Sequence, residues 1–383
     1  MRSGPIDEIF ATLAGRPDII SFAVGSPDTE LLPADLLVEL VGTAVAKYGQ
    51  PVLQYGMTRG FAPLLQQADK LLRRRGIHCD PDMPQITTGG SGGLHSACMA
   101  LLDPGGIVLV ETPTYGPAVK TFHAHGATVA EVECDQQGMT PAALDRALSA
   151  RATAFVYLLP TFQNPTGRTI PAARRAQLAE VILRHDALVI EDDIYTDLRY
   201  RGEPVPTFWS FAPENTIYLT SLSKTFAPAS RIGIAVPPPQ LSEQILALKQ
   251  CIDMQTSTLA QAIAAEFLSG GYADAHLARI VGAYSSKLDT LSDALERHLP
   301  REFHWVKPDG GMFLWIEGPA EFDADLLLDR ALGQGVAFLP GSVFYPGSGP
   351  THRNTMRLSF ASIAPRDIER GIGRLATLLR DPV

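Results

Sequence analysis

The sequence predicts an α/β protein in which a large domain with a mostly parallel sheet adjoins a smaller α+β domain. Over the middle of the chain, short β-branched runs alternate with Ala- and Leu-rich stretches of helical length, which is the pattern of βαβ crossovers. About the last hundred residues change in character, because short strand-like runs are separated there by helices. We expect residues 45–270 to form the large domain, and residues 1–44 with 271–383 to form the small one.

The expected elements follow from these runs in chain order. Strands of the large domain are expected at residues 106–110, 128–133, 153–159, 187–190, 216–219 and 231–236. Helices are expected at residues 141–150, 171–184, about 241–267 and about 273–298. Strands of the small domain are expected at residues 306–317, 335–338 and 356–360. Open parallel sheets bind ligands at the carboxyl ends of their strands, so the residues after each strand are candidate site residues.

Composition excludes several classes of function. The 383 residues carry a net charge of −9, which argues against a nucleic-acid backbone as the main partner. The apolar set makes up 45% of the chain, enough for a buried core, yet no apolar run is long enough to span a membrane. The four cysteines are widely spaced and form no metal-binding pattern. We therefore expect a cytoplasmic protein with no metal, nucleic-acid or membrane partner.

A lysine follows one of the expected strands, within Thr220-Ser221-Leu222-Ser223-Lys224. Such a lysine is usually a solvated loop residue. Here the hydroxyls of Ser221 and Ser223, with Arg231 seven residues after the lysine, are the donors that a phosphate group requires. A lysine amine beside a phosphate site is what a phosphorylated aldehyde cofactor needs to form a Schiff base.

Asp192 and Tyr195 follow the strand expected at residues 187–190. In the simplest interpretation the acidic side chains cap the next element. In the functional one, Asp192 points at a pyridinium nitrogen and keeps it protonated, which makes the ring a better acceptor for the electrons of a carbanion. Tyr195 would then reach the neighbouring ring oxygen.

Three further segments are ambiguous when each is taken alone. The turn Gln163-Asn164-Pro165-Thr166-Gly167 is either a plain turn or a rigid mount for Asn164, whose side chain can donate to a phenolate oxygen. The glycine-rich segment around Gly90 and Ser91 opens a helix, whose N–H groups favour an anion. Tyr115 either packs ordinarily or stacks on a planar ring.

The order of these motifs is far more specific than any one of them. A glycine-rich helix start, a tyrosine, Asn-Pro-Thr-Gly, Asp-x-x-Tyr and Ser-x-Ser-Lys with a later arginine occur in that sequence. In this the chain resembles the fold-type I pyridoxal-phosphate (PLP) enzymes of the class I/II aminotransferase family. It is most similar to the branch that holds 2-aminoadipate, kynurenine and aromatic aminotransferases and the aminotransferase-like domains of GntR-fused regulators. The resemblance runs from about Ile20 through Leu53-Gln54-Tyr55-Gly56 to Met356-Arg357-Leu358-Ser359-Phe360.

The resemblance implies a role for each matching residue. Lys224 would form the Schiff base and shuttle the α-proton, and Asp192 would pair with the pyridinium nitrogen. Asn164 and Tyr195 would hold the ring hydroxyl, and Tyr115 would stack on the ring. The phosphate would be held by a set of small and basic residues, namely Gly90, Ser91, Ser221, Ser223 and Arg231.

The resemblance also implies a substrate site and a partner subunit. Arg357 would form a bidentate pair with the α-carboxylate of an amino acid, helped by Asn164 and the backbone at Gly25. Tyr55 would reach the phosphate of the other subunit, which implies a homodimer with shared active sites. The partners are then an amino acid and a 2-oxo acid.

Two segments depart from the family's pattern. Where the phosphate loop usually carries Ser-Gln-Gln after the glycine, this chain has Gly90-Ser91-Gly92, so backbone donors replace a side-chain contact. Dicarboxylate-using members of the branch tend to carry an arginine in a Ser-x-Ile-Arg stretch of the N-terminal helix, and here the matching stretch is Gly4-Pro5-Ile6-Asp7. Asp7 either faces solvent or repels a second carboxylate, which would favour a neutral, polar or cationic substrate side chain.

Three functions are compatible with the sequence to different degrees. The leading hypothesis is an aminotransferase that moves an amino group from an amino acid to a 2-oxo acid. The alternative is a PLP-dependent lyase, decarboxylase or oxidative deaminase on the same scaffold, since the cofactor serves all of these. The third, a sensor domain of a transcription regulator, is disfavoured by the acidic net charge and by a resemblance that begins by about residue 20.

Overall fold

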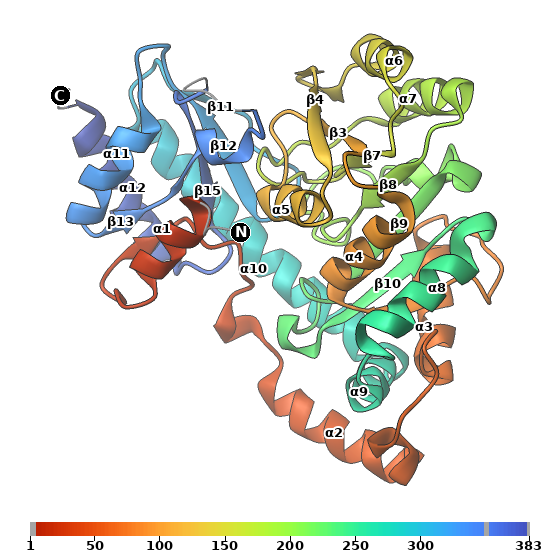
Figure 1. Ribbon diagram of the computed structural model, residues 1–383. Helices are drawn as coiled ribbons and strands as arrows, with labels where there is room; N and C mark the ends of the chain where they lie inside the picture. Colours follow the sequence, from red (N-terminus) through yellow and green to blue (C-terminus); the bar gives the residue numbers. More distant parts are fainter. Residues whose placement is uncertain (1–4, 348–351, 381–383) are drawn as a thin grey trace.

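The computed structural model describes residues 5–347 and 352–380, and its main features are two sheets joined by long helices (Figure 1). Parts of the predicted small domain, including Gly4 of the stretch before Asp7, lie outside the described residues. Among the described residues, no helix is long and apolar enough to cross a lipid bilayer.

The larger sheet has seven strands in the order β2-β10-β9-β8-β7-β3-β4. Their bounds are β2 (Gln85–Thr88), β3 (Ile107–Glu111), β4 (Thr128–Val132), β7 (Phe155–Leu158), β8 (Val189–Asp192), β9 (Thr216–Ser221) and β10 (Ile232–Val236). The pairs from β9 through β8, β7 and β3 to β4 are parallel, whereas β10 runs antiparallel to both of its neighbours. The predicted mostly parallel sheet is therefore confirmed.

Helices cover both faces of this sheet because alternate strand residues point to opposite sides. Val108 and Tyr157 belong to the apolar cluster of one face, which includes side chains of α4 (Gly89–Leu101), α5 (Gly116–Ala124) and α8 (Pro239–Asp253). Leu109 and Leu158 belong to the other cluster, with α6 (Pro141–Ala150) and α7 (Ala172–His185). With apolar clusters on both faces, the carboxyl ends of the parallel strands are where polar residues gather.

The single helix predicted at about residues 241–267 is wrong. The structure has two helices there, α8 and α9 (Thr258–Ser269). Met254 takes a left-handed φ of 59°, which ends α8, and the Ser257 side chain accepts a hydrogen bond from the Ala260 backbone and caps α9. The polar residues between them interrupt a stretch whose apolar composition alone suggested continuity.

The smaller sheet has four antiparallel strands in the order β11-β12-β15-β14. Their bounds are β11 (His304–Trp305), β12 (Phe313–Glu317), β14 (Leu339–Pro340) and β15 (Thr355–Ser359). The strand predicted at residues 306–317 is thus only partly correct, because Pro308 and Gly311, whose φ is 78°, separate β11 from β12. A further pair, β1 (Ile20–Ser21) with β13 (Val336–Ala337), forms a separate two-stranded parallel sheet.

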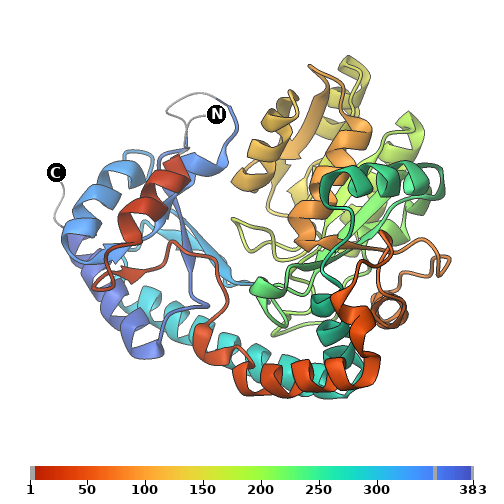
Figure 2. The same cartoon turned by 60° about the horizontal axis from the view of Figure 1, so that its bottom comes forward.

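Long helices connect the two sheets. Figure 2 shows α2 (Ala34–Tyr48) and α10 (Tyr272–His298) running along the bottom of the molecule from one half to the other. α10 contacts α9 at the large sheet and α12 (Pro365–Arg380) at the small one. The remaining elements are α1 (Pro5–Leu13), α3 (Ala62–Arg74), α11 (Ala324–Gly333), β5 (Cys134–Asp135), β6 (Gly138–Met139) and six short 3₁₀ turns.

Candidate active site

Lys224 lies in the turn that follows β9, and its side chain is directed at the other half of the molecule. Its Nζ donates a hydrogen bond to the backbone carbonyl of Gly25, 3.1 Å away. Burial, together with the positive charges of Arg357 and Arg231, lowers the pKa of this amine to about 8. The Lys224 amine can therefore lose its proton close to neutral pH.

Arg357 lies in β15, with only 3% of the residue exposed. Its Nη1 donates to Asn164 Oδ1 at 2.8 Å, and its Nη2 donates to the carbonyl oxygen of Ala23. Its guanidinium carbon lies 4.3 Å from the centre of the Phe313 ring. Burial lowers the pKa of Arg357 to about 10, so the guanidinium remains charged at neutral pH and keeps its two-pronged donor geometry.

Both cations reach the same stretch of backbone, residues 23–25. Ser359 anchors the stretch because its N–H donates to the Phe22 carbonyl at 2.8 Å. A side chain at position 25 would collide with Phe313, since an added Cβ would lie 2.7 Å from the ring. Glycine is therefore required where the backbone approaches Lys224.

Asp192 is the last residue of β8 and is buried. Its Oδ2 accepts a hydrogen bond from the Tyr157 hydroxyl at 2.7 Å, while its Oδ1 is buried without a partner. Burial raises the pKa of this carboxyl to about 6, and the bond from Tyr157 opposes that increase. A buried carboxylate oxygen without a donor fits a protonated ring nitrogen, so the residues present suit a pyridine-type cofactor.

A cradle for an anion forms where α4 begins. Gly89 has a left-handed φ of 72°, and an added Cβ there would lie 2.5 Å from Nη2 of Arg231, so the guanidinium packs directly on the glycine. An added Cβ at Gly90 would lie 3.9 Å from the Cβ of Ser221. The Ser221 hydroxyl donates to Ser223 Oγ at 2.8 Å. Backbone N–H groups, hydroxyls and a guanidinium at one place match the donors that a phosphate requires.

The other predicted residues divide into two groups. Tyr195 hydrogen-bonds to the Asn164 side chain and packs edge-on against Phe313, with ring centres 5.7 Å apart. Burial, together with the negative charge of Asp192, raises the pKa of Tyr115 to about 12. Ser91 is exposed in the first turn of α4. Tyr55 lies apart from all of these, and 77% of it is exposed.

Sequence reasoning did not single out the Tyr157 hydroxyl, the Ala23 carbonyl or the Phe313 ring. A tyrosine inside a strand predicted to be buried needs a polar partner, so Tyr157 had a usable signal. Ala23 contributes only its backbone carbonyl, and Phe313 has the sequence pattern of an ordinary core residue. Neither of them therefore carries a signal in the sequence.

Comparison with known proteins agrees with this geometry. The family model for aminotransferase class I and II matches residues 17–375. An aromatic-amino-acid aminotransferase of Thermococcus litoralis is 34% identical, over 100% of this chain and 92% of its own length. A 2-aminoadipate transaminase of Thermus thermophilus is 34% identical, over 96% of this chain and 92% of its own length.

Solved structures agree as well. The kynurenine aminotransferase of Pyrococcus horikoshii, solved with PMP, superposes with a TM-score of 0.92 at 35% identity, covering 99% of this chain and 95% of its own. The protein is thus similar to these enzymes in sequence and in structure along almost its whole described length. The chain belongs to the class I and II aminotransferase family, whose members are PLP-dependent enzymes.

Proposed function

We propose that this protein moves an amino group from an α-amino acid to a 2-oxo acid at the site between Lys224 and Arg357. The observation that carries the proposal is that a buried lysine amine and a buried guanidinium both donate to one short backbone stretch, at the carbonyls of Gly25 and Ala23. The first is suited to proton transfer and the second to holding a carboxylate. The activities of the relatives support the aminotransferase hypothesis rather than the lyase hypothesis.

The chain's residues fit PLP in two groups. Asp192 would hold the ring nitrogen, Asn164 and Tyr195 the ring oxygen, and Tyr115 one face of the ring. The phosphate would be held by the cradle at the start of α4, formed by Gly90, Ser91, Ser221, Ser223 and Arg231. When bound there, the cofactor supplies an electron-withdrawing ring that accepts the electron pair released at the substrate α-carbon.

Substrate binding and proton transfer are proposed for Arg357 and Lys224. Arg357 would fork onto the α-carboxylate, with Asn164 close enough to share that contact, and so fix the α-carbon in place. Lys224 Nζ would take the α-proton and return it at a neighbouring atom. The Phe313 ring beside Arg357 excludes water from the carboxylate pair and strengthens it.

The half-reaction tests this proposal directly. Purified protein loaded with PLP is mixed with single amino acids while no 2-oxo acid is present, and the absorbance of the cofactor is followed. A transaminase changes the spectrum once, holds it, and recovers only when a 2-oxo acid is added. Continuous product formation with an unchanged spectrum would instead indicate a lyase, decarboxylase or oxidase.

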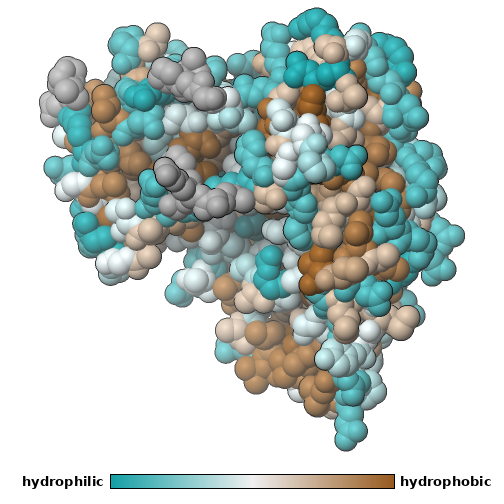
Figure 3. Space-filling view, in the orientation of Figure 1, coloured by the Kyte–Doolittle hydropathy of each residue, from teal (hydrophilic) through white to brown (hydrophobic). Residues whose placement is uncertain are grey.

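We also propose that two copies of the chain share their active sites through Tyr55. Exposed apolar side chains surround its position, with exposed fractions of 71% for Leu53, 75% for Met57 and 55% for Met254. The N–H of Gly56 donates to the Gln255 side chain, which joins two parts of this surface. A further apolar strip lies along α2, at Val38 and Val41, where brown covers the bottom of Figure 3.

Mixed dimers test the sharing of sites. The Lys224→Ala and Tyr55→Ala variants are each expected to be impaired when pure. When the two are mixed after unfolding and refolding, half of the sites in a mixed dimer receive Lys224 from one chain and an intact Tyr55 from the other. Activity above that of either pure variant supports the proposal, and activity no higher than their average contradicts it.

The substrate side chain is proposed to be one without a distal carboxylate. Asp7 on α1 forms an ion pair with Lys120 on α5, with 2.5 Å between Oδ2 and Nζ, so this carboxylate links the N-terminal helix to the large sheet's layer. The stretch that holds an arginine in dicarboxylate-using members of the branch thus holds a carboxylate already paired with Lys120, and it offers no guanidinium to a second carboxylate. In the half-reaction, lysine, ornithine or aromatic amino acids should therefore react faster than glutamate, and the reverse order would contradict the role of Asp7.

The cytoplasm is proposed as the location. All four cysteines in the described residues are free, which is usual in a reducing compartment.

A further inference from the structure

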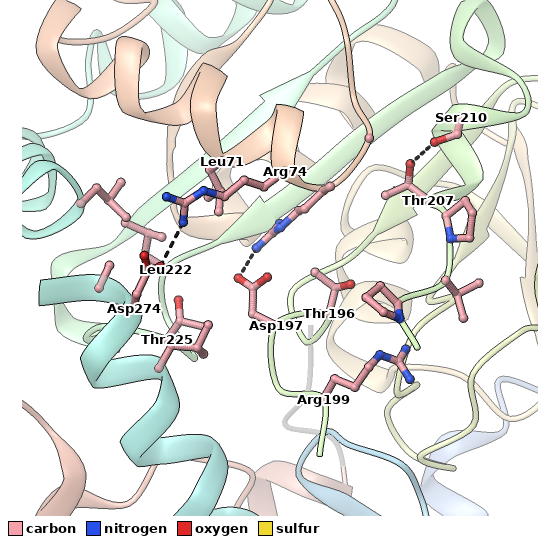
Figure 4. Close-up of a pocket in the computed structure, with 18 of the residues that line it drawn as sticks. Leu71, Arg74, Thr196, Asp197, Arg199, Thr207, Ser210, Leu222, Thr225 and Asp274 are labelled. Carbon is pink, nitrogen blue, oxygen red and sulfur yellow. Dashed lines mark hydrogen bonds and ion pairs between the residues drawn. The ribbon is translucent and has the colours of Figure 1, made fainter. Parts of the chain in front are cut away.

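A second cavity, of about 520 Å³, lies behind the Lys224 turn and apart from the candidate active site. Figure 4 shows it between α3 above, the start of α10 below and the loop of residues 196–210. Much of its wall is apolar, from Leu71, Phe267, Leu268 and Leu277. The volume is in the range of small-molecule sites, which runs from about 300 to 1,000 Å³.

The charged residues of the wall leave one cation unmatched. Arg74 pairs with Asp274 at 3.0 Å, and Arg75 pairs with Asp197 (Figure 4, dashed lines). Among the described residues, no carboxylate lies within ion-pair distance of Arg199. Its guanidinium carbon lies 4.6 Å from the centre of the Phe162 ring, its Nη1 donates to the Arg201 carbonyl at 3.4 Å, and its Nη2 is buried without a hydrogen-bond partner. The charged side chains that line the cavity therefore sum to +1, while the carboxylates of Asp309, Asp193 and Glu203 act on Arg199 from outside the lining.

The cavity adjoins the turn that carries Lys224. Leu222 and Thr225 line the cavity and stand on either side of Ser223 and Lys224 in the chain. The turn is held by hydrogen bonds to the Leu222 carbonyl from the N–H groups of Thr225, at 3.3 Å, and Phe226, at 2.9 Å. A molecule in the cavity would thus press on the base of the Lys224 turn.

A buried chain of hydrogen bonds makes a second connection. Arg75 Nη1 donates to the Tyr218 hydroxyl at 2.8 Å, and that hydroxyl donates to Asp193 Oδ2 at 2.9 Å, next to Asp192. Arg75 Nη1 also donates to the Thr220 hydroxyl at 2.7 Å, next to Ser221. The cavity wall is therefore connected both to the carboxylate proposed for the ring and to the hydroxyl proposed for the phosphate.

We propose that this cavity is an effector site for a small organic monocarboxylate with an apolar body, whose occupancy alters the Lys224 turn. The apolar walls take the hydrocarbon or aromatic body, and Arg199 takes the carboxylate. Arg74 and Arg75 are already paired with Asp274 and Asp197, so the lining offers one unpaired cation and the proposed ligand is a monoanion.

The probe for this proposal is 3-phenylpropanoate, which has the required shape but has no amino or oxo group to react. Binding is measured by calorimetry on PLP-loaded protein carrying Arg357→Gln, so that the proposed substrate carboxylate site is removed. Arg199→Gln removes the cation, and Leu268→Trp fills the cavity from α9 without touching Arg199. Arg184→Gln, on α7 and paired with Asp145, is the matched control for removing an arginine.

The expected result is one bound probe per chain, with a change in the absorbance of the bound cofactor. Arg199→Gln, or replacing the probe by 3-phenylpropanamide, should weaken binding about ten-fold or more, Leu268→Trp should abolish it, and Arg184→Gln should leave it unchanged. Binding that survives Leu268→Trp, or that is absent once Arg357 is replaced, would overturn the site. Binding that leaves the cofactor absorbance unchanged would overturn its connection to Lys224. Loss of PLP from the starting protein would count against the proposed function instead.

Discussion

Lys224 and Arg357 are both buried cations that donate to carbonyls of residues 23–25, yet burial has opposite consequences for their chemistry. The pKa of Lys224 falls to about 8, within reach of neutral pH, and its Nζ is held by one carbonyl. The pKa of Arg357 also falls, to about 10, but a guanidinium at that value still keeps its proton. The same environment thus yields a group that exchanges protons and a group that only binds anions.

The largest expected effect is that of Lys224→Ala. Removing the amine removes both the attachment of PLP and the base, so turnover should fall by about 10³-fold or more. Turnover and the cofactor retained after borohydride reduction are the measurements. Activity within ten-fold of the wild type would assign the proton transfer to another group.

Arg357→Gln should act on substrate binding rather than on proton transfer. Losing a buried charged donor should raise KM for the amino acid by about 10²-fold while PLP remains bound. Steady-state kinetics and a titration with PLP separate the two effects. Arg374→Gln is the control, because Arg374 donates only to backbone carbonyls near the surface, at Gln334 and Gly335. An equal effect of both substitutions would contradict a role in carboxylate binding.

Asp192→Asn should act on the cofactor rather than on the substrate. The carboxylate charge is removed while the shape is kept, so kcat should fall on the order of 10²-fold with little change in KM. Steady-state kinetics are the measurement. A fall in kcat/KM that comes from a higher KM alone, with kcat unchanged, would indicate that Asp192 contacts the substrate rather than the cofactor ring.

Tyr157→Phe has the smallest expected effect and should appear as a shift in pH dependence. The Tyr157 hydroxyl stabilises the ionised Asp192, so its removal raises the pKa of that carboxyl above its value of about 6. PLP binding needs the ionised carboxylate. As the pH is lowered, the affinity of cofactor-free protein for PLP should therefore begin to fall at a higher pH in the variant than in the wild type. Tyr284→Phe, another buried tyrosine with a hydrogen bond, should leave the profile unchanged.

The parts of the site that sequence could predict are those that follow strands. Lys224, Asp192 and Asn164 come after β9, at the end of β8 and after β7, so the predicted fold class and the rule that ligands bind at strand carboxyl ends were enough to single them out. Their roles came from the order of the motifs, since each motif alone was ambiguous.

The parts that sequence could not predict depend on backbone groups and on distant partners. Ala23 and Arg357 are separated by 334 residues, and Ala23 contributes only a carbonyl that any residue possesses. The break at Met254 follows from a left-handed φ in an unremarkable polar segment. The cavity at Arg199 exists only because α3, α9, α10 and the loop of residues 196–210 leave space between them.

The pH dependence of PLP capture by cofactor-free protein tests directly whether burial prepares Lys224 for proton transfer. Capture requires an uncharged Lys224 amine. The initial rate of covalent capture is measured by rapid borohydride quenching at pH values from below to above neutrality. This rate should rise with pH, with a midpoint of about 8. Replacing Arg357 by Gln removes a neighbouring positive charge and should move that midpoint upward. A wild-type midpoint near 10.5, the ordinary value for lysine, would contradict the claim that burial prepares Lys224 for proton transfer.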